Sequence, residues 1–230
     1  MPQAPPTWFS IIPFLKDIPP HVAGAICVSA LLIIASYLVS RRLKREESLV
    51  PEDRLTLGNI FEVLVEFVTG LADDVIGHEG RKYLPLVGSI FIFILCCNVM
   101  GLIPGLSPPT MSISTNAACA LVAFLAYNYY GFKEHGTKYI NQFLGPFLPI
   151  AVVFLPAEIF SQAFRPITLS IRLFANMFAD HNVIEAFGHL VPILVPVPFI
   201  FLGLFVAFLQ AFVFTLLTMV YISLAVSHEH

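Results

Sequence analysis

The feature of this sequence that most restricts its fold is a series of long apolar runs that carry almost no charged residues. About 20 apolar residues suffice for a helix to cross a bilayer, and lipid offers no hydrogen-bond partner to an unpaired backbone group. The runs are too long and too uniformly apolar for barrel strands, which alternate. The chain is 57% hydrophobic and only 12% charged. We therefore predict an all-α polytopic membrane protein.

The apolar runs predict five membrane-embedded helices within a single membrane domain, residues 1–230. We expect these helices at 21–40, 83–104, 115–132, 143–188 and 198–226. The last two are longer than a simple span needs, so they must tilt or kink to stay within the hydrocarbon. The first of these two is expected to break near Pro149, Pro156 or Pro166. Residues 1–20, which hold six prolines, are expected to form an outer N-terminal segment.

One further helix is predicted at 55–77, on the membrane surface rather than across the membrane. Its acidic residues, among them Glu62 and Glu66, are costly inside lipid, whereas an amphipathic surface helix accommodates them. In the resulting topology, nine of the twelve lysines and arginines fall on one side of the membrane. The positive-inside rule then places the N-terminus outside and the C-terminus in the cytoplasm.

Polar and charged residues gather in one stretch, residues 158–189, inside a predicted membrane-embedded helix. A charge at the bilayer centre costs about 2.5–3.5 kcal/mol even on the mildest scale, so such residues are functional candidates. At about 100° per residue, one stripe of this helix carries Glu158, Arg165, Arg172 and Asn176. A second stripe, roughly opposite Arg172, carries His181, Glu185 and His189. Two polar faces on one helix are typical of an ion path rather than of a packing core.

Arg172 is the strongest of these candidates. Its guanidinium stays charged, so it cannot carry a proton, but it can hold a nearby carboxylate ionised. Opposite charges about 4 Å apart attract by roughly 4 kcal/mol at an effective dielectric constant near 20. None of the chain's own carboxylates is an evident partner for Arg172, which suggests that the partner carboxylate belongs to another subunit. Titratable groups at two depths, Glu158 on one side and His181 with Glu185 on the other, suggest two aqueous half-paths that do not join.

Several of the remaining candidates also have ordinary structural explanations. Arg165 could simply extend its charge to the inner interface. His189 also fits a loop. Asn176 and Gln210 could each form helix–helix hydrogen bonds, as polar residues in membranes often do. Asp180, beside His181, is a candidate without an assigned role.

Two segments, IRLFANMFADH and LQAFVFTLLTMVYISLA, closely resemble the last two helices of the a subunit of the bacterial F-type ATP synthase. The resemblance extends to the topology, with an outer N-terminus, a surface helix in second place and two long C-terminal helices. It implies that Arg172 faces the carboxylates of the rotating c-ring. It also implies that Asn176 and Gln210 lie near that arginine, and that Glu158 belongs to the cytoplasmic half-channel.

The resemblance also exposes one departure from the family. His181 occupies a position that is glutamate or histidine in the family. Its reciprocal partner on the last helix, seven residues before the glutamine, is Gly203 in this sequence. Glu185, one turn from His181, is the substitute that we expect.

The implied function is a proton-translocating stator subunit of the Fo sector in a bacterial inner membrane. The implied partners are the c-ring, the b-subunit peripheral stalk and the rest of the F1Fo complex. A chloroplast version and a sodium-carrying one remain open. The alternative is a self-contained ion-coupled secondary transporter, which would require an inverted repeat that the sequence does not show.

Other functional classes lack their signatures in the sequence. It has no P-loop or other nucleotide motif, so we expect no enzyme activity of the chain alone, no bound nucleotide and no cofactor. It has no basic patch with interleaved aromatic residues, so we expect no nucleic-acid partner. The four cysteines, Cys27, Cys96, Cys97 and Cys119, lie in apolar runs without metal-ligand spacing. They are predicted to be small buried residues, and no metal site is expected.

Overall fold

The computed structural model describes residues 18–43, 57–77, 79–103, 106–136, 139, 148–190 and 196–226. Within them, all regular structure is helical, in agreement with the predicted all-α fold. The six α-helices are α1 (Pro20–Leu43), α2 (Leu57–Val75), α3 (Leu84–Met100), α4 (Ile113–His135), α6 (Leu148–Leu190) and α7 (Pro196–Val226). Two short 3-10 turns, η3 (Gly80–Lys82) and η4 (Pro109–Met111), precede α3 and α4. Each predicted helical range overlaps one of the six helices, whereas nearly all of the outer segment 1–20 lies outside the described residues.

Two of these helices are long and apolar enough to cross a membrane by themselves. They are Pro20–Arg41 and Val197–Val226, and Leu84–Met100 is a shorter apolar helix. The helical membrane architecture is therefore supported, while five membrane-embedded helices are a finer prediction than length and composition establish.

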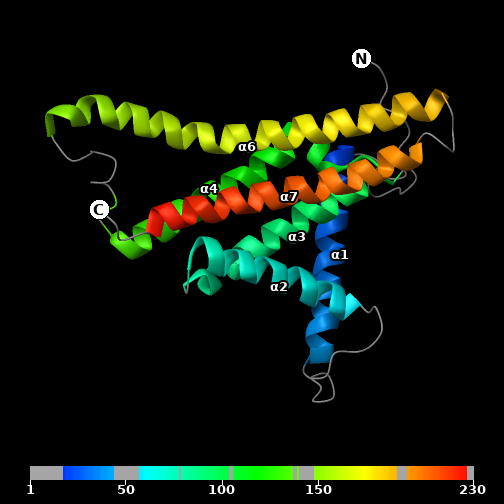
Figure 1. Ribbon diagram of the computed structural model, residues 1–230, viewed down its shortest axis with the longest axis horizontal. Helices are drawn as coiled ribbons and strands as arrows, with labels where there is room; N and C mark the ends of the chain where they lie inside the picture. The colour runs from blue at the N-terminus through cyan, green and yellow to red at the C-terminus, as the bar shows by residue number, and fades with distance from the viewer. Residues whose placement is uncertain are drawn as a thin grey trace.

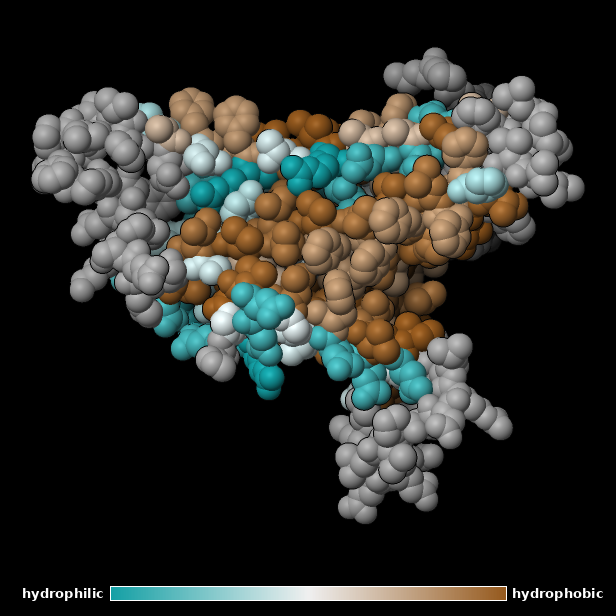
Figure 2. Space-filling view, viewed as in Figure 1, coloured by the Kyte–Doolittle hydropathy of each residue, from teal (hydrophilic) through white to brown (hydrophobic). Residues whose placement is uncertain are grey.

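The helices pack around α7. Figure 1 shows α6 and α7 side by side and antiparallel, α3 and α2 on the other side of α7, and α1 crossing the others steeply. α7 contacts α2, α3, α4 and α6, and its inward positions include the fully buried Ala207 and Ala211. Small residues at such positions let neighbouring helices approach closely, which is how helices associate in lipid. Figure 2 shows a broad apolar surface across the middle of the molecule, below a row of polar atoms along α6.

The prediction that the long helix breaks at a proline is wrong for the two prolines inside it. α6 continues through Pro156 and Pro166. A proline removes one backbone hydrogen bond, but a membrane helix that packs against neighbouring helices can continue through it. Beside Pro166, the hydroxyl of Ser170 donates to the carbonyl of Pro166 at 2.7 Å, and that of Thr168 donates to the carbonyl of Phe164 at 3.0 Å. These bonds add to the helix but do not replace the bond that the proline removes.

The ends of the helices form two groups, and each group contains only segments predicted to share a side of the membrane. At one end, a Cβ placed on Gly24 of α1 would lie 3.1 Å from the side chain of Pro109 in η4, so these segments are in contact. At the other end, Lys82 Nζ lies 3.3 Å from Glu134 Oε2, and the rings of Tyr83 and Tyr130 pack edge to face. The turn that carries Lys82 and the C-terminal end of α4 therefore lie together, away from the start of α1.

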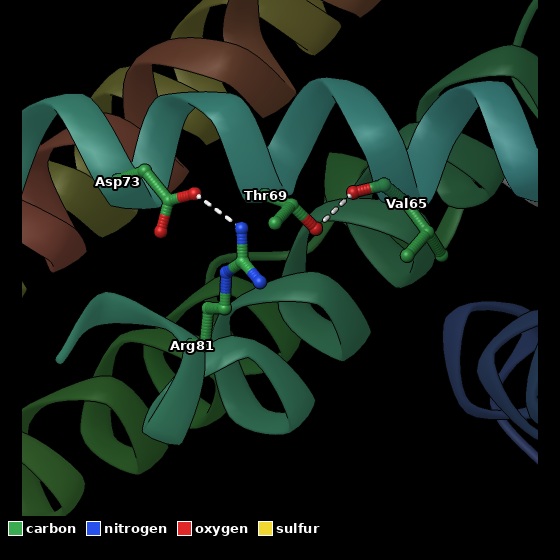
Figure 3. A network of polar contacts seen from close by, with 4 residues as sticks. All are labelled: Val65, Thr69, Asp73 and Arg81. Carbon is green, nitrogen blue, oxygen red and sulfur yellow. Dashed lines mark hydrogen bonds and ion pairs between the residues drawn. The ribbon is translucent and has the colours of Figure 1, made fainter. Parts of the chain in front are cut away.

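α2 is amphipathic and docks through its apolar face. The ring of Phe67 lies within 6.0 Å of the rings of Phe91, Phe208 and Phe212, and Val68 is fully buried. The side chains of Glu62 and Glu66 are exposed. Figure 3 shows Arg81 of η3 reaching back to α2, where its guanidinium lies 3.2 Å from a carboxylate oxygen of Asp73. α2 is thus tied to the bundle at its middle and at its C-terminal end.

The Lys82–Glu134 contact makes a pH-dependent prediction. The hydrogen bond to Glu134 raises the pKa of Lys82 above its ordinary value. A raised pKa in the folded state means that the contact stabilises the fold at neutral pH and is lost as the pH rises through that pKa. We expect Glu134→Gln to lower the pKa of Lys82, measured by NMR of carbon-13-methylated lysines. Glu79→Gln, which removes a weaker influence, is the control and should lower it less.

Candidate functional site

Arg172 lies on the outer surface of α6, where its side chain is exposed. Its neighbour Ile171 is exposed as well, at 50%. Among the described residues, Arg172 has neither an ion-pair nor a hydrogen-bond partner. An unpaired cation on an exposed surface can act on a group that a neighbouring molecule brings to it.

The interface between α6 and α7, which we call the seam, lies beside Arg172 and contains a hydrogen-bonded pair of polar side chains. The amide of Asn176, one turn after Arg172, donates from Nδ2 to Oε1 of Gln210 at 2.7 Å. The side chain of Gln210 is only 4% exposed. The interhelical hydrogen bond considered for these two residues is thus present. It fixes the position of α7 relative to the turn of α6 that carries Arg172.

Arg165, two turns before Arg172, is held by a second set of contacts. Its guanidinium lies 4.6 Å from the centre of the Tyr221 ring, in a cation–π contact, and its NH1 lies 3.5 Å from Oε1 of Gln162. The hydroxyl of Tyr127 on α4 donates to the same oxygen of Gln162 at 2.5 Å. The side chain is half-buried, so Arg165 does more than extend its charge to an interface. It links three helices.

The cation–π contact supplies a testable prediction about stability. Tyr221→Leu removes the ring and is expected to lower the free energy of unfolding of the detergent-solubilised subunit by about 0.5–2 kcal/mol. Tyr221→Phe keeps the ring and is expected to retain most of that stability. Equal losses in the two variants would show that the hydroxyl, rather than the ring under Arg165, contributes the stability.

The structure describes the side chains of only some of the remaining candidate residues. Asp180 is half-buried, and its Oδ2 is buried without a hydrogen-bond partner in the described part of the chain. His181 is half-buried, and Gly203 is buried. The side chains of Glu158, Glu185 and His189 lie outside the described ones, so the expected replacement of the missing partner at Gly203 by Glu185 stays a prediction.

Sequence reasoning missed several polar contacts of the bundle. Tyr127 and Tyr221 were not among the candidates, although both are polar residues within predicted spans. Asn98, in the range predicted at 83–104, is fully buried and donates from Nδ2 to the carbonyl of Ala207 at 3.2 Å. A polar residue within a predicted span was the available signal for all three.

The predicted burial of the cysteines also needs correction. Cys97 is buried and Cys96 and Cys119 are partly buried, whereas Cys27 is exposed. Cys27 lies on α1, which crosses the other helices and leaves much of its own surface uncovered, including Ile26 at 52% exposure. The prediction was wrong for Cys27 because an apolar run does not distinguish residues that face helices from those that face lipid.

The geometry therefore consists of an exposed, unpaired arginine beside a polar seam between two long antiparallel helices. The same chain matches the sequence model described as ATP synthase A chain over residues 23–223. It is 42% identical to the ATP synthase subunit a of Bdellovibrio bacteriovorus over 226 residues, which cover 97% of this chain and 98% of that protein. The chain belongs to the ATP synthase subunit a family.

Other members of the family match over most of their length. An ATP synthase subunit a from Syntrophotalea carbinolica is 42% identical over 91% of this chain and 87% of that protein. The ATP synthase subunit a of a Sulfurihydrogenibium species is 39% identical over 91% of this chain and 99% of that protein. Subunit a is a non-catalytic subunit of the membrane sector, Fo, so the expectation that the chain is no enzyme by itself is confirmed.

Proposed function

We propose that this chain is the stator through which protons cross the Fo sector of a bacterial F1Fo ATP synthase. It offers two offset half-paths to a ring of c-subunits, and Arg172 separates them. The observation that carries the proposal is the placement of Arg172. It is exposed on α6 and has no partner in the described chain, beside a seam fixed by the Asn176–Gln210 hydrogen bond. Membership of the subunit a family supports the same role.

The proposed cycle uses charge to move a proton in one direction. A proton from the outer side arrives near His181 and Glu185 and neutralises a ring carboxylate, which can then face lipid. After the ring turns, the carboxylate releases its proton to the inner path near Glu158 and meets Arg172 as an anion. The attraction of about 4 kcal/mol between charges about 4 Å apart favours this ionised state. The membrane potential contributes roughly 2.3 kcal/mol per charge per 100 mV.

The partners and orientation belong to the same proposal. The c-ring would lie against the exposed face of α6 around Arg172, and the b-subunit stalk would hold the chain to F1. The N-terminus would lie outside and the C-terminus in the cytoplasm of a bacterial inner membrane. The positive-charge asymmetry supports this orientation. The contact between Lys82 of η3 and Glu134 at the end of α4 supports it as well, because it puts these two segments on one side.

Passive proton conduction tests the proposal. Vesicles would be prepared with Fo stripped of F1, either complete or lacking only this chain, and a potassium diffusion potential would be imposed with valinomycin. In vesicles with complete Fo, we expect the internal pH to fall or rise according to the sign of the potential. In vesicles whose Fo lacks this chain, we expect the internal pH to stay constant. Proton conduction that persists without the chain, or conduction of sodium alone, would contradict the proposal.

A further inference from the structure

The turn of α6 around Pro166 lacks a backbone hydrogen bond and lies close to Arg172. Proline has no N–H, so the bond from residue 166 to the carbonyl of Gln162 is missing, although α6 continues through this turn. Arg172 lies six residues further on, about 9 Å along the helix. A proline kink of about 20° at this turn would move the backbone of Arg172 by roughly 3 Å. The position of the arginine therefore depends on what keeps this turn straight.

Side chains of the same turn fasten it to two neighbouring helices. The hydroxyl of Tyr127 on α4 donates to Oε1 of Gln162 at 2.5 Å, and Tyr127 is only 2% exposed. The guanidinium of Arg165 lies 4.6 Å from the centre of the Tyr221 ring on α7, and its Nη1 lies 3.5 Å from the same oxygen of Gln162. We name these four residues the proline-turn clamp: Gln162, Arg165, Tyr127 and Tyr221. They hold the turn through other helices, where its own backbone bond is missing.

The clamp and the seam hold α6 on both sides of Arg172. The hydrogen bond of the seam joins Asn176 to Gln210, and the clamp joins Arg165 to Tyr221. These contacts are 11 residues apart on each of the two antiparallel helices, which is about 16 Å. Arg172 lies between them, on a length of α6 that is supported at each end. Without the clamp, that length would be tied at one end only.

Arg165 and Arg172 share one stripe of α6 but differ in what they contact. They are two turns apart and only about 20° round from each other. The side chain of Arg172 is exposed, whereas that of Arg165 is half-buried against the Tyr221 ring. A cation inside an apolar bundle is costly, and an aliphatic side chain would pack in the same place at less cost. The directional contacts that Arg165 makes therefore explain its charge better than packing does.

We propose that Arg165 is a positioning residue: through the proline-turn clamp it keeps the Pro166 turn straight, so that Arg172 stays at a fixed distance from the ring carboxylates. The proposal rests on the proposed function and adds what holds the arginine while the ring turns. Electrostatic attraction varies inversely with distance, so a shift of about 3 Å from a separation of about 4 Å removes roughly two-fifths of it. A ring that pushes past α6 would otherwise bend the helix at its weakest turn.

Proton pumping with conservative variants tests the clamp. In an assembled complex, we expect Arg165→Leu and Tyr221→Leu each to lose about nine-tenths of ATP-driven pumping. Arg165→Lys and Tyr221→Phe keep the cation and the ring, respectively, and should retain most of it. Thr168→Val is the control, because the Thr168 hydroxyl bonds to carbonyls of α6 itself, and it should pump normally. Normal pumping by assembled Arg165→Leu would overturn the proposal.

A second background separates positioning from general weakening. Passive proton leak under an imposed pH difference would be measured for Arg165→Leu alone and combined with Arg172→Ala. Because Arg165 acts by placing Arg172, the leak of the single variant should be several-fold faster than that of the unmodified chain. In the Arg172→Ala background, Arg165→Leu should leave the leak almost unchanged, since the group that it positions is already absent. The same fold-increase in both backgrounds would overturn the proposal.

Distances between spin labels test the shape of α6 without reference to proton transport. With the four native cysteines replaced by alanine, labels would be attached to Leu125→Cys on α4 and Phe178→Cys on α6 in the whole complex. Both side chains are exposed, and Phe178 lies about 120° round from Arg172. Residue 178 lies about 18 Å beyond the proline, so we expect Arg165→Leu to shift or broaden the distance distribution by at least about 2 Å.

The spin-label result and the proposed function can fail independently. An unchanged distance distribution in Arg165→Leu would overturn the clamp, whatever Arg172 does. A shifted distribution, together with an assembled Arg172→Ala complex that stays proton-tight, would instead overturn the proposed function and leave the clamp standing.

Discussion

ATP-driven proton pumping by the assembled complex is expected to fall by about three orders of magnitude in Arg172→Ala. The expectation follows from the charge. An attraction of roughly 4 kcal/mol between the guanidinium and a passing carboxylate is removed, and each 1.4 kcal/mol corresponds to about a factor of ten. Without this attraction, nothing favours the ionised form of the carboxylate at this position of the ring, so the proton stays bound. Quenching of a pH-sensitive dye in inverted vesicles measures the loss directly.

The neighbouring residue provides a matched control for that experiment. Ile171→Ala removes a 50%-exposed apolar side chain from the same turn of α6 but leaves the charge. It is expected to pump at close to the normal rate if the surface tolerates the smaller contact area. Immunodetection of the subunits must show that both variants assemble. An equal loss in the two variants would mean that contact area, rather than charge, matters at this surface.

Gln210→Leu is expected to reduce coupled pumping by about ten-fold in an assembled complex. Gln210 is buried and accepts the hydrogen bond of Asn176. The substitution leaves the Asn176 amide without its partner, and a group unsatisfied in this way costs about 1–3 kcal/mol. The cost is relieved only if α6 and α7 shift, and a shift moves the turn that carries Arg172.

A double-mutant cycle distinguishes this coupling from a general weakening. Asn176→Leu alone should have an effect similar to that of Gln210→Leu. The double variant should lose less than the product of the two single losses, because residues in direct contact are energetically coupled. Fully independent effects would show that the hydrogen bond is not what positions the seam.

The helix positions were predictable because each apolar run long enough to enter the membrane indicates a helix at that place in the sequence. The run predicted at 115–132 became α4, Ile113–His135, and the one at 198–226 became α7, Pro196–Val226. The uninterrupted course of α6 was not predictable, because proline breaks most helices in water, whereas a membrane helix that packs against its neighbours can continue through it.

The site was predictable along each helix but not between helices. Periodicity placed Arg172 and Asn176 on one stripe, and the structure shows where that stripe points. The periodicity of the sequence could not reveal that Arg172 lies on the exposed face of α6 while Asn176, one turn later, contacts Gln210. Nor could it reveal that Arg165 lies over Tyr221, because that contact depends on the register between two helices.

The central claim is that Arg172 keeps the two half-paths apart, and passive proton leak tests it most directly. The measurement compares vesicles carrying the fully assembled complex, without nucleotide, under an imposed pH difference. In the absence of the arginine, a ring carboxylate can remain protonated across the gap and connect the paths. The account therefore predicts a faster collapse of the pH difference for Arg172→Ala than for the unmodified chain or Ile171→Ala. An assembled Arg172→Ala complex that holds the pH difference as long as the unmodified chain does would contradict it.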